Sequence, residues 1–256
     1  MDGLARLVGL IGESMPHSSN LPTNQNSSGP SDRHFSRVGA LTALLGLIVY
    51  GTSAMLHPGT PPHETQAAFA EYAEEPLWGL IHLGEFLGIL LMCVTGLALA
   101  WRLRRGAAGV WAALAAVAMT LFAAVYAIFT AVDGVALKVL VSRWADAGPE
   151  EQQLLYETAF AVRQVEAGLF SLQWLVFGLA AGLFAPAFLK SGVDRSWAVG
   201  MGILSALASL GTLAFGIVQA QTGFSEQSMA FQTGLYVGVL WIMLAGIFLY
   251  RSPNPD

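Results

Sequence analysis

Six long runs of apolar residues, separated by shorter polar segments, dominate the hydrophobic pattern of the chain. The runs are continuously apolar and rich in Ala, Leu and Gly, whereas the strands of a transmembrane barrel alternate apolar and polar residues over about 10 positions. A helix that crosses the hydrocarbon core of a bilayer needs about 20 apolar residues. The pattern therefore predicts six transmembrane helices, at residues 38–56, 77–101, 110–132, 168–189, 197–218 and 231–250.

The composition agrees with this pattern. Hydrophobic residues make up 55% of the 256 residues and charged residues only 11%, against about 25% charged residues in soluble domains. We therefore expect an all-α polytopic membrane protein, a six-helix bundle with short extracytoplasmic helical segments and the lipid bilayer as its main partner. The net charge is -5 and no basic block with interleaved aromatics occurs, which argues against nucleic acid as a partner. The single cysteine, Cys93, excludes an intrachain disulfide or a thiolate metal cage.

The polar ends of the chain define its predicted organisation. Residues 14–37 are rich in Ser, Asn, Pro and Gly, a composition that buries too little apolar surface to become ordered. We predict a disordered cytoplasmic tail at 1–37, a membrane domain at 38–250 and a cytoplasmic tail at 251–256. The apolar residues 4–11 follow Asp2 and lack a small-residue cleavage site, so they do not resemble a secretory signal peptide. Met15 is an alternative translation start.

The distribution of Lys and Arg predicts the orientation, because cytoplasmic flanks retain an excess of both. Nine of the 12 fall on one predicted side: Arg6, Arg33, Arg37, Arg102, Arg104, Arg105, Lys190, Arg195 and Arg251. The three others, Lys138, Arg143 and Arg163, share the opposite side with most of the acids. We therefore predict a multi-pass protein of the bacterial inner (plasma) membrane with both termini in the cytoplasm.

Two outer segments are long enough to carry structure of their own. Residues 57–76 open with a Pro-rich stretch and continue as an acidic, helix-like one. The second segment spans 133–164, where Pro149-Glu150-Glu151 is typical of a helix start, because proline suits the first turn and acids there complement the dipole. We expect the helix at 110–132 to continue through Lys138 toward Trp144, and the outer segments to form a small cap.

Polar side chains gather at the outer ends of five predicted helices. His82 and Glu85 share one helix face, and Tyr126, Thr130 and Asp133 form another stripe. Ionisable groups at membrane depth are costly and usually mark functional sites. The predicted ligand-binding set is His82, Glu85, Tyr126, Thr130, Asp133, Lys138, Arg163, Glu166, Gln173, Gln219 and Gln232. The alternative is that Asp133, Lys138, Arg163 and Glu166 form interfacial salt bridges that only lock helix ends together.

Metal binding is the sharpest chemical hypothesis. His82-x-x-Glu85 has the i, i+3 spacing of carboxylate sites in helical bundles, and our best ligand set is His82, Glu85 and Glu166, with Asp133 as a further candidate. A separate loop site at His57, His63 and Glu64 is the alternative. His82 is the only intramembrane histidine, which argues against a haem held between two histidines. Hydrolase and nucleotide-binding signatures are absent, and the sequence identifies no cofactor.

One stretch resembles a known group of proteins. Ala131-Val132-Asp133-Gly134-Val135-Ala136-Leu137-Lys138, with Trp144 beyond it and Arg163-Gln164-Val165-Glu166 opening the next helix, resembles six-helix integral membrane proteins of bacteria, particularly actinobacteria, of unknown function. The resemblance covers residues 38–250. It implies the six-helix topology and marks the neighbourhood of Asp133, Lys138 and Glu166, but it implies no activity.

Three functions fit these observations. The leading hypothesis is a non-enzymatic membrane protein that binds a small polar ligand or ion in an outward-facing pocket, in transport or sensing. The second is a metal-dependent or carboxylate-assisted membrane enzyme that uses the same residues. The third is a structural or accessory subunit in which the polar layer aligns the helices and the outer loops dock a partner.

Overall fold

The computed structural model describes residues 30–251, and all the regular secondary structure in that range is helical. Six helices or helical runs are long and apolar enough to cross a membrane, which confirms the predicted all-α polytopic bundle. The long elements are α2 (Pro30–Leu56), α4 (Trp78–Arg102), α5 (Gly109–Thr130), α7 (Pro149–Leu189), α8 (Arg195–Thr222) and α10 (Thr233–Arg251). The short ones are α3 (Thr65–Glu74), η1 (Gly106–Ala108), η2 (Ala131–Leu137), α6 (Lys138–Asp146) and α9 (Glu226–Phe231).

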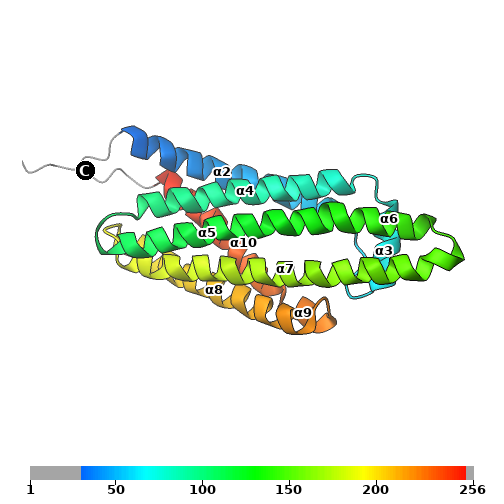
Figure 1. Cartoon of the computed structure of the whole chain (residues 1–256). Helices are drawn as coiled ribbons and strands as arrows, with labels where there is room; N and C mark the ends of the chain where they lie inside the picture. The colour runs from blue at the N-terminus through cyan, green and yellow to red at the C-terminus, as the bar shows by residue number, and fades with distance from the viewer. Residues whose placement is uncertain (1–29, 252–256) are drawn as a thin grey trace, which may run out of the picture.

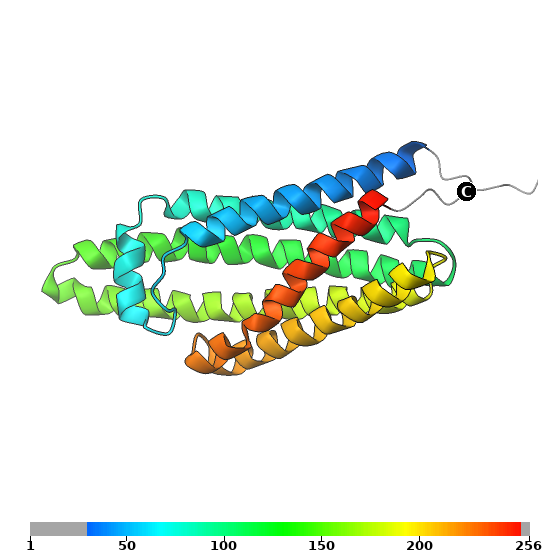
Figure 2. The same cartoon turned by 180° about the vertical axis from the view of Figure 1, so that it is seen from behind.

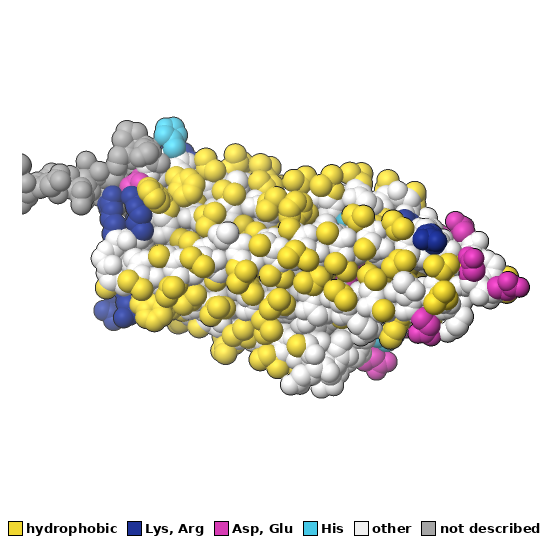
Figure 3. Space-filling model, in the orientation of Figure 1, with side chains coloured by type: hydrophobic (Ala, Val, Ile, Leu, Met, Phe, Trp, Pro, Cys, Tyr) yellow, Lys and Arg dark blue, Asp and Glu magenta, His cyan; other side chains and the backbone are white. Residues whose placement is uncertain are grey.

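The outer surface of the bundle is apolar over its middle (Figure 3). Large side chains such as Leu80, Val110 and Leu210 are each about two-thirds exposed. In water such a surface would be a large unfavourable patch, whereas in a bilayer it faces acyl chains while the helices satisfy their own backbone hydrogen bonds. The exposed leucines and valines are therefore the lipid-facing side of the fold.

The first helix begins earlier than the sequence pattern predicts. We placed residues 30–37 in a disordered tail, but α2 starts at Pro30 and continues without a break to Leu56. Asp32 in its first turn accepts hydrogen bonds from Trp101 Nε1 at 2.8 Å and from Arg104 Nη2 at 3.0 Å. These tertiary contacts stabilise a turn whose composition alone favours disorder. The remainder of the predicted tail, residues 1–29, lies outside the described residues, as do residues 252–256.

The second outer segment is built from two helices that continue out of the bundle. The third span runs through η2 into α6 and ends at Asp146, as predicted. The fourth begins at Pro149, as its proline and the acids after it predict, and stays helical for 41 residues, so the span predicted at 168–189 is the later part of one continuous helix. A helix of this length measures about 60 Å, twice the hydrocarbon thickness of a bilayer. The α6 and α7 ends therefore project together beyond the apolar middle (Figure 1).

The helices form one bundle in which α10 crosses between α2 and α8 (Figure 2). Small residues bring the helices of this face close together. A Cβ added to Gly211 of α8 would lie 3.0 Å from the carbonyl oxygen of Gly234 in α10. Such close backbone contact is the usual use of glycine between membrane helices, where apolar burial provides no driving force of its own.

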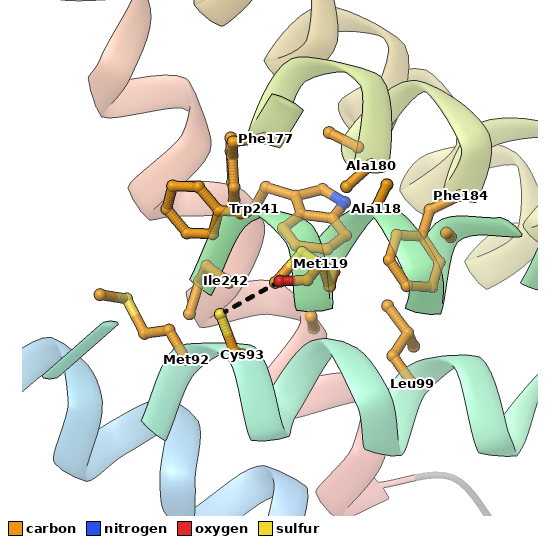
Figure 4. Packing of buried hydrophobic residues seen from close by; sticks show 14 of the residues in the cluster. Met92, Cys93, Leu99, Ala118, Met119, Phe177, Ala180, Phe184, Trp241 and Ile242 are labelled. Atoms are coloured by element: carbon orange, nitrogen blue, oxygen red, sulfur yellow. Dashed lines mark hydrogen bonds between the residues drawn. The ribbon is translucent and has the colours of Figure 1, made fainter. Parts of the chain in front are cut away.

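The centre of the bundle is a dry aromatic and aliphatic core (Figure 4). The Trp241 indole lies 5.3 Å from the Phe184 ring and 6.0 Å from the Phe177 ring, centroid to centroid. Cys93 is buried here, and its thiol donates to the Met119 carbonyl oxygen at 3.7 Å. The charged groups of the protein lie toward its two ends, and a polar side chain within this core, Ser205, accepts a hydrogen bond from Trp241 Nε1 at 2.8 Å.

A second, smaller hydrophobic cluster fills a cap at the end of the bundle that carries α3 and α6. It joins α3 to α6 and to the first turns of α7, with Phe69, Tyr72, Trp78, Trp144 and Ala159 all buried. Figures 1 and 2 show α3 lying across the bundle beside α6 and α7. The cap thus holds the loop that precedes α3 over the polar ends of the membrane helices.

Candidate functional site

A buried contact between α4 and η2 lies beneath the cap. His82 Nε2 is 2.9 Å from Asp133 Oδ2, and both side chains are shielded from solvent. His82 Nδ1 lies 2.8 Å from the carbonyl oxygen of Trp78 one turn earlier in α4. The indole nitrogen of Trp78 in turn donates to the backbone carbonyl of Asp133 at 3.3 Å. These three contacts together set the orientation of the His82 ring relative to Asp133.

The local backbone explains how this contact forms. Residues 131–137 are π-helical, a rare conformation that appears mostly as short segments inside α-helices and frequently at functional sites. A Cβ added to Gly134 would lie 2.8 Å from His82 Cβ, closer than real Cβ contacts come. Only glycine at this position lets α4 approach near enough for His82 to reach Asp133.

An ion pair within α7 occupies the neighbouring part of the site. Arg163 Nη1 is 2.9 Å from both carboxylate oxygens of Glu166, and the two side chains are each 4% exposed. Arg163 Nη2 donates to the Tyr72 hydroxyl and to the Pro62 carbonyl oxygen, both at 3.4 Å. The guanidinium carbon stands 4.2 Å from the centroid of the Phe224 ring. Burial raises the pKa of Tyr72 to about 12, so its hydroxyl stays protonated at neutral pH.

The loop after α2 brings a second histidine to this layer. The His57 ring lies 5.4 Å from the rings of Trp78 and His82, centroid to centroid. Its Nδ1 is 3.2 Å from the Pro58 carbonyl oxygen. Burial lowers the pKa of His57 despite the opposing effect of the Asp133 carboxylate, so the ring is neutral at pH 7. One donor atom each from His57, His82 and Asp133 lies within 4.8 Å of the others.

The same loop is fastened to α3 through a carboxylate. The backbone N–H groups of Gly59 and Thr60 donate to Glu71 at 3.0 and 2.8 Å. Hydrogen bonds from Thr60 and Gly59 lower the pKa of Glu71, which is therefore ionised at neutral pH. The anchor lies two residues from His57 and limits how far that ring can move.

A cavity of about 400 Å³ opens among these groups. Glu85 of α4 faces it beside the ion pair, and the Tyr126 hydroxyl donates to Glu85 Oε2 at 3.4 Å. Its lining consists of Tyr50, Ala54, His57, Pro58, Gly59, Pro62, Tyr72, Glu85, Tyr126, Phe129, Asp133, Arg163, Glu166, Phe170, Phe224 and Gln232. Glu85 therefore points into the protein, together with Asp133 and Glu166.

Most of the predicted ligand-binding set meets here. Six of its members line the cavity and a seventh, His82, adjoins it through Asp133. The six are Glu85, Tyr126, Asp133, Arg163, Glu166 and Gln232. They come from α4, α5, η2, α7 and the turn before α10.

Four predicted residues have other roles. Lys138 Nζ donates to the Tyr72, Ala73 and Glu75 carbonyl oxygens at 2.6 to 3.0 Å and so closes the C-terminal end of α3. The hydroxyl of Thr130 bonds within its own helix. Gln173 and Gln219 are fully buried away from the cavity lining, and neither side-chain amide has a hydrogen-bond partner among the described residues.

The structure places His57 differently from the sequence-based prediction, which put it in a separate loop site with His63. His57 instead lies beside His82 and Asp133. His63 Nε2 lies 3.9 Å from Glu226 Oε1. Our best metal set combined His82 with Glu85 and Glu166, but the one group with ligand geometry in residues 30–251 contains His82 with Asp133 and His57. Tyr72 and Phe224 were missed because aromatic residues in outer segments carry no positional signal of their own.

Charged groups separate along the bundle. Lys and Arg gather at the end that holds the start of α2, and Asp and Glu cluster at the projecting opposite end (Figure 3). Comparison of the chain with protein-family models, curated proteins and solved structures finds no match. Inference about function therefore depends on the geometry of this chain alone.

Proposed function

We propose that this membrane protein binds a small positively charged ligand, an inorganic cation or a cationic solute, in the cavity at its acidic end. The charge of the cavity lining carries the proposal. Glu85, Asp133 and Glu166 bring three carboxyl groups to it, whereas Arg163 brings one guanidinium. With all three carboxyls ionised the lining has two negative charges in excess, in a medium where electrostatic interactions are stronger than in water, and a bound cation would favour this ionised form by offsetting them.

The shape of the site supports ligand binding over a purely structural role. A polar layer that only aligned helices would be filled by its own ion pairs, yet a volume of about 400 Å³ remains beside Arg163 and Glu166. Small-molecule sites are cavities of this size with a few convergent polar groups. Tyr50 lines both the cavity and an apolar crevice that includes Met119 and Trp174. In both transport and sensing, the ligand is expected to enter the cavity from the acidic end of the bundle.

The proposal places the cavity on the outer face of the plasma membrane, with both termini in the cytoplasm. The concentration of Lys and Arg at the opposite end supports this orientation. A ligand from outside the cell would then reach Glu85 without crossing the apolar core.

Thermal unfolding of the purified protein in lipid nanodiscs tests the proposal. The chain is heated with Na⁺, K⁺, Mg²⁺, Zn²⁺, ammonium or small organic amines, and with matched anion salts. A bound cation is expected to raise the unfolding temperature saturably, because a ligand at 100 times its Kd adds about 2.7 kcal/mol to the native state. Glu85→Gln should weaken this effect at least tenfold.

Glu150→Gln is the matched control, because Glu150 is an exposed acid of the first turn of α7. It should leave the cation effect unchanged. Stabilisation that depends on ionic strength alone, equal in both variants and in the native chain, would contradict the proposal. That result would instead favour a polar layer with a structural role.

A further inference from the structure

We propose that His57, His82 and Asp133 form a binding site for a divalent transition-metal ion of the zinc type, with one coordination position open toward the cavity. The inference rests on the proposed function, since His57 and Asp133 line the same cavity. It goes further by naming the ligand atoms and the class of cation.

The hydrogen bonds of His82 provide the first support. A backbone carbonyl only accepts, so the Trp78 carbonyl oxygen at 2.8 Å requires the proton on His82 Nδ1. In the neutral ring, Nε2 then directs a lone pair at Asp133 Oδ2, 2.9 Å away. Two lone pairs at that distance repel unless a proton or a metal ion lies between them. Metal-bound histidines have this arrangement, in which the second ring nitrogen donates to a carbonyl and fixes the ring.

His57 repeats the pattern from the other side. Its Nδ1 faces the Pro58 carbonyl oxygen at 3.2 Å and therefore carries the ring proton. The lone pair of Nε2 is then free to bind a metal ion. One ligand atom from each of His57, His82 and Asp133 lies within 4.8 Å of the others. Ligand atoms in a tetrahedral zinc site are separated by about 3.3 Å, so the His82–Asp133 pair at 2.9 Å would open slightly and His57 would move inward by about 1.5 Å or less. Glu71 holds the loop backbone at Gly59 and Thr60, so this small adjustment falls to His57 itself, which precedes the anchor.

Asp133 has free capacity for a cation. The side chain is 6% exposed, and Oδ1 has no hydrogen-bond partner among the described residues. Buried carboxylate oxygens are normally satisfied, and one that is not needs a specific explanation. A metal ion shared between the carboxylate of Asp133 and the two imidazoles supplies that missing interaction.

The donor set selects the class of metal. Two imidazole nitrogens and one carboxylate suit Zn²⁺ and related transition metals, whereas Ca²⁺ and Mg²⁺ require shells of oxygen ligands. Three protein ligands leave a further position, as in catalytic rather than structural zinc sites. Since His57 and Asp133 face the cavity, that position is reachable by water or by a small ligand.

The test measures Zn²⁺ binding to the full chain, purified with a tag that contains no histidine. The protein is first stripped of metal with a chelator and then loaded with Zn²⁺. Metal analysis should then show one Zn²⁺ per chain, and Ca²⁺ and Mg²⁺ should not compete for the site. His57→Ala should lower the Zn²⁺ affinity at least tenfold. The matched control is His63→Ala, which removes another histidine of the same loop, located near Glu226 rather than in the cluster, and should leave affinity unchanged.

X-ray absorption of the Zn²⁺-loaded native protein tests the ligand set without a variant, so misfolding of a mutant cannot affect the result. Two imidazole ligands and oxygen ligands at about 2.0 Å are expected. Fewer than two imidazoles, or equal loss of binding in His57→Ala and His63→Ala, would overturn the site. No Zn²⁺ binding while other cations still stabilise the protein through Glu85 would overturn this inference and leave the proposed function intact. If no cation stabilises the protein, both fail.

Discussion

The two ends of the bundle contain the same interaction in opposite surroundings. At the basic end, Arg104 Nη2 is 3.0 Å from Asp32, with side chains 33% and 15% exposed. At the acidic end, Arg163 Nη1 is 2.9 Å from Glu166, and both side chains are 4% exposed. The distances are nearly equal, so the difference between the two pairs is burial.

Burial changes what each pair contributes. A partly exposed pair such as Arg104–Asp32 gains less, because water still reaches both charges and salt screens them. A buried pair loses that solvation, and its removal as a unit is often neutral or stabilising, while removal of one partner leaves an uncompensated charge. The pair of α7 is thus a poor device for stability alone, which is consistent with its place in the wall of a cavity.

The largest expected effect comes from breaking the buried pair on one side. Arg163→Met leaves the Glu166 carboxylate buried without its partner and should cost about 3–5 kcal/mol of unfolding free energy. Denaturant titration in mixed micelles measures the change. The double variant with Glu166→Leu should recover most of the loss. If Arg163→Met alone costs less than the equivalent Arg104→Met, burial is not what distinguishes the two ends.

An intermediate effect is expected from closing the space between α4 and η2. Gly134→Ala places a Cβ 2.8 Å from His82 Cβ, and overpacking of this kind costs about 1–3 kcal/mol. It should also part His82 from Asp133 and reduce Zn²⁺ affinity. Gly168→Ala is the control, because no atom lies within 4 Å of the added carbon, and it should be neutral or slightly stabilising. Equal effects of both variants would show that the close approach is unimportant.

The smallest effect is expected at the basic end. Asp32→Asn removes the carboxylate that Arg104 and Arg105 share at 3.0 and 3.2 Å. The loss should be about 1 kcal/mol or less and should shrink further in high salt. Unfolding measured at low and high ionic strength checks this. A loss above that of Gly134→Ala, or one insensitive to salt, would mean that Asp32 anchors α2 through more than charge.

Much of the fold was predictable because its signals are local. Each span depends on a count of consecutive apolar residues, and the i, i+3 contact of Arg163 with Glu166 follows from helix geometry alone. The predicted start failed at α2, where tertiary contacts extend the helix into polar sequence, whereas the start of α7 at Pro149 was predicted from its proline and the acids that follow. At α2 the Asp32 contacts with Trp101 and Arg104 stabilise residues that composition marks as disordered.

The site was predictable only in outline. The sequence placed polar groups at one level of five helices, and most of them do line one cavity. Whether a given group faces that cavity depends on the rotation of each helix, which neighbouring side chains decide. Lys138 instead donates hydrogen bonds to carbonyl oxygens at the C-terminal end of α3. Gln173 and Gln219 are buried away from the cavity lining.

By itself, the amino-acid order determined that this chain is a bundle of six membrane helices with polar ends, because spanning a bilayer is a matter of length and hydrophobicity along one segment. The tertiary structure alone decided that a loop histidine, His57, would meet His82 and Asp133. This cluster requires the cap to position the loop that carries His57, and it requires glycine at position 134 so that α4 can approach η2 closely. Both conditions arise from contacts between residues far apart in the chain.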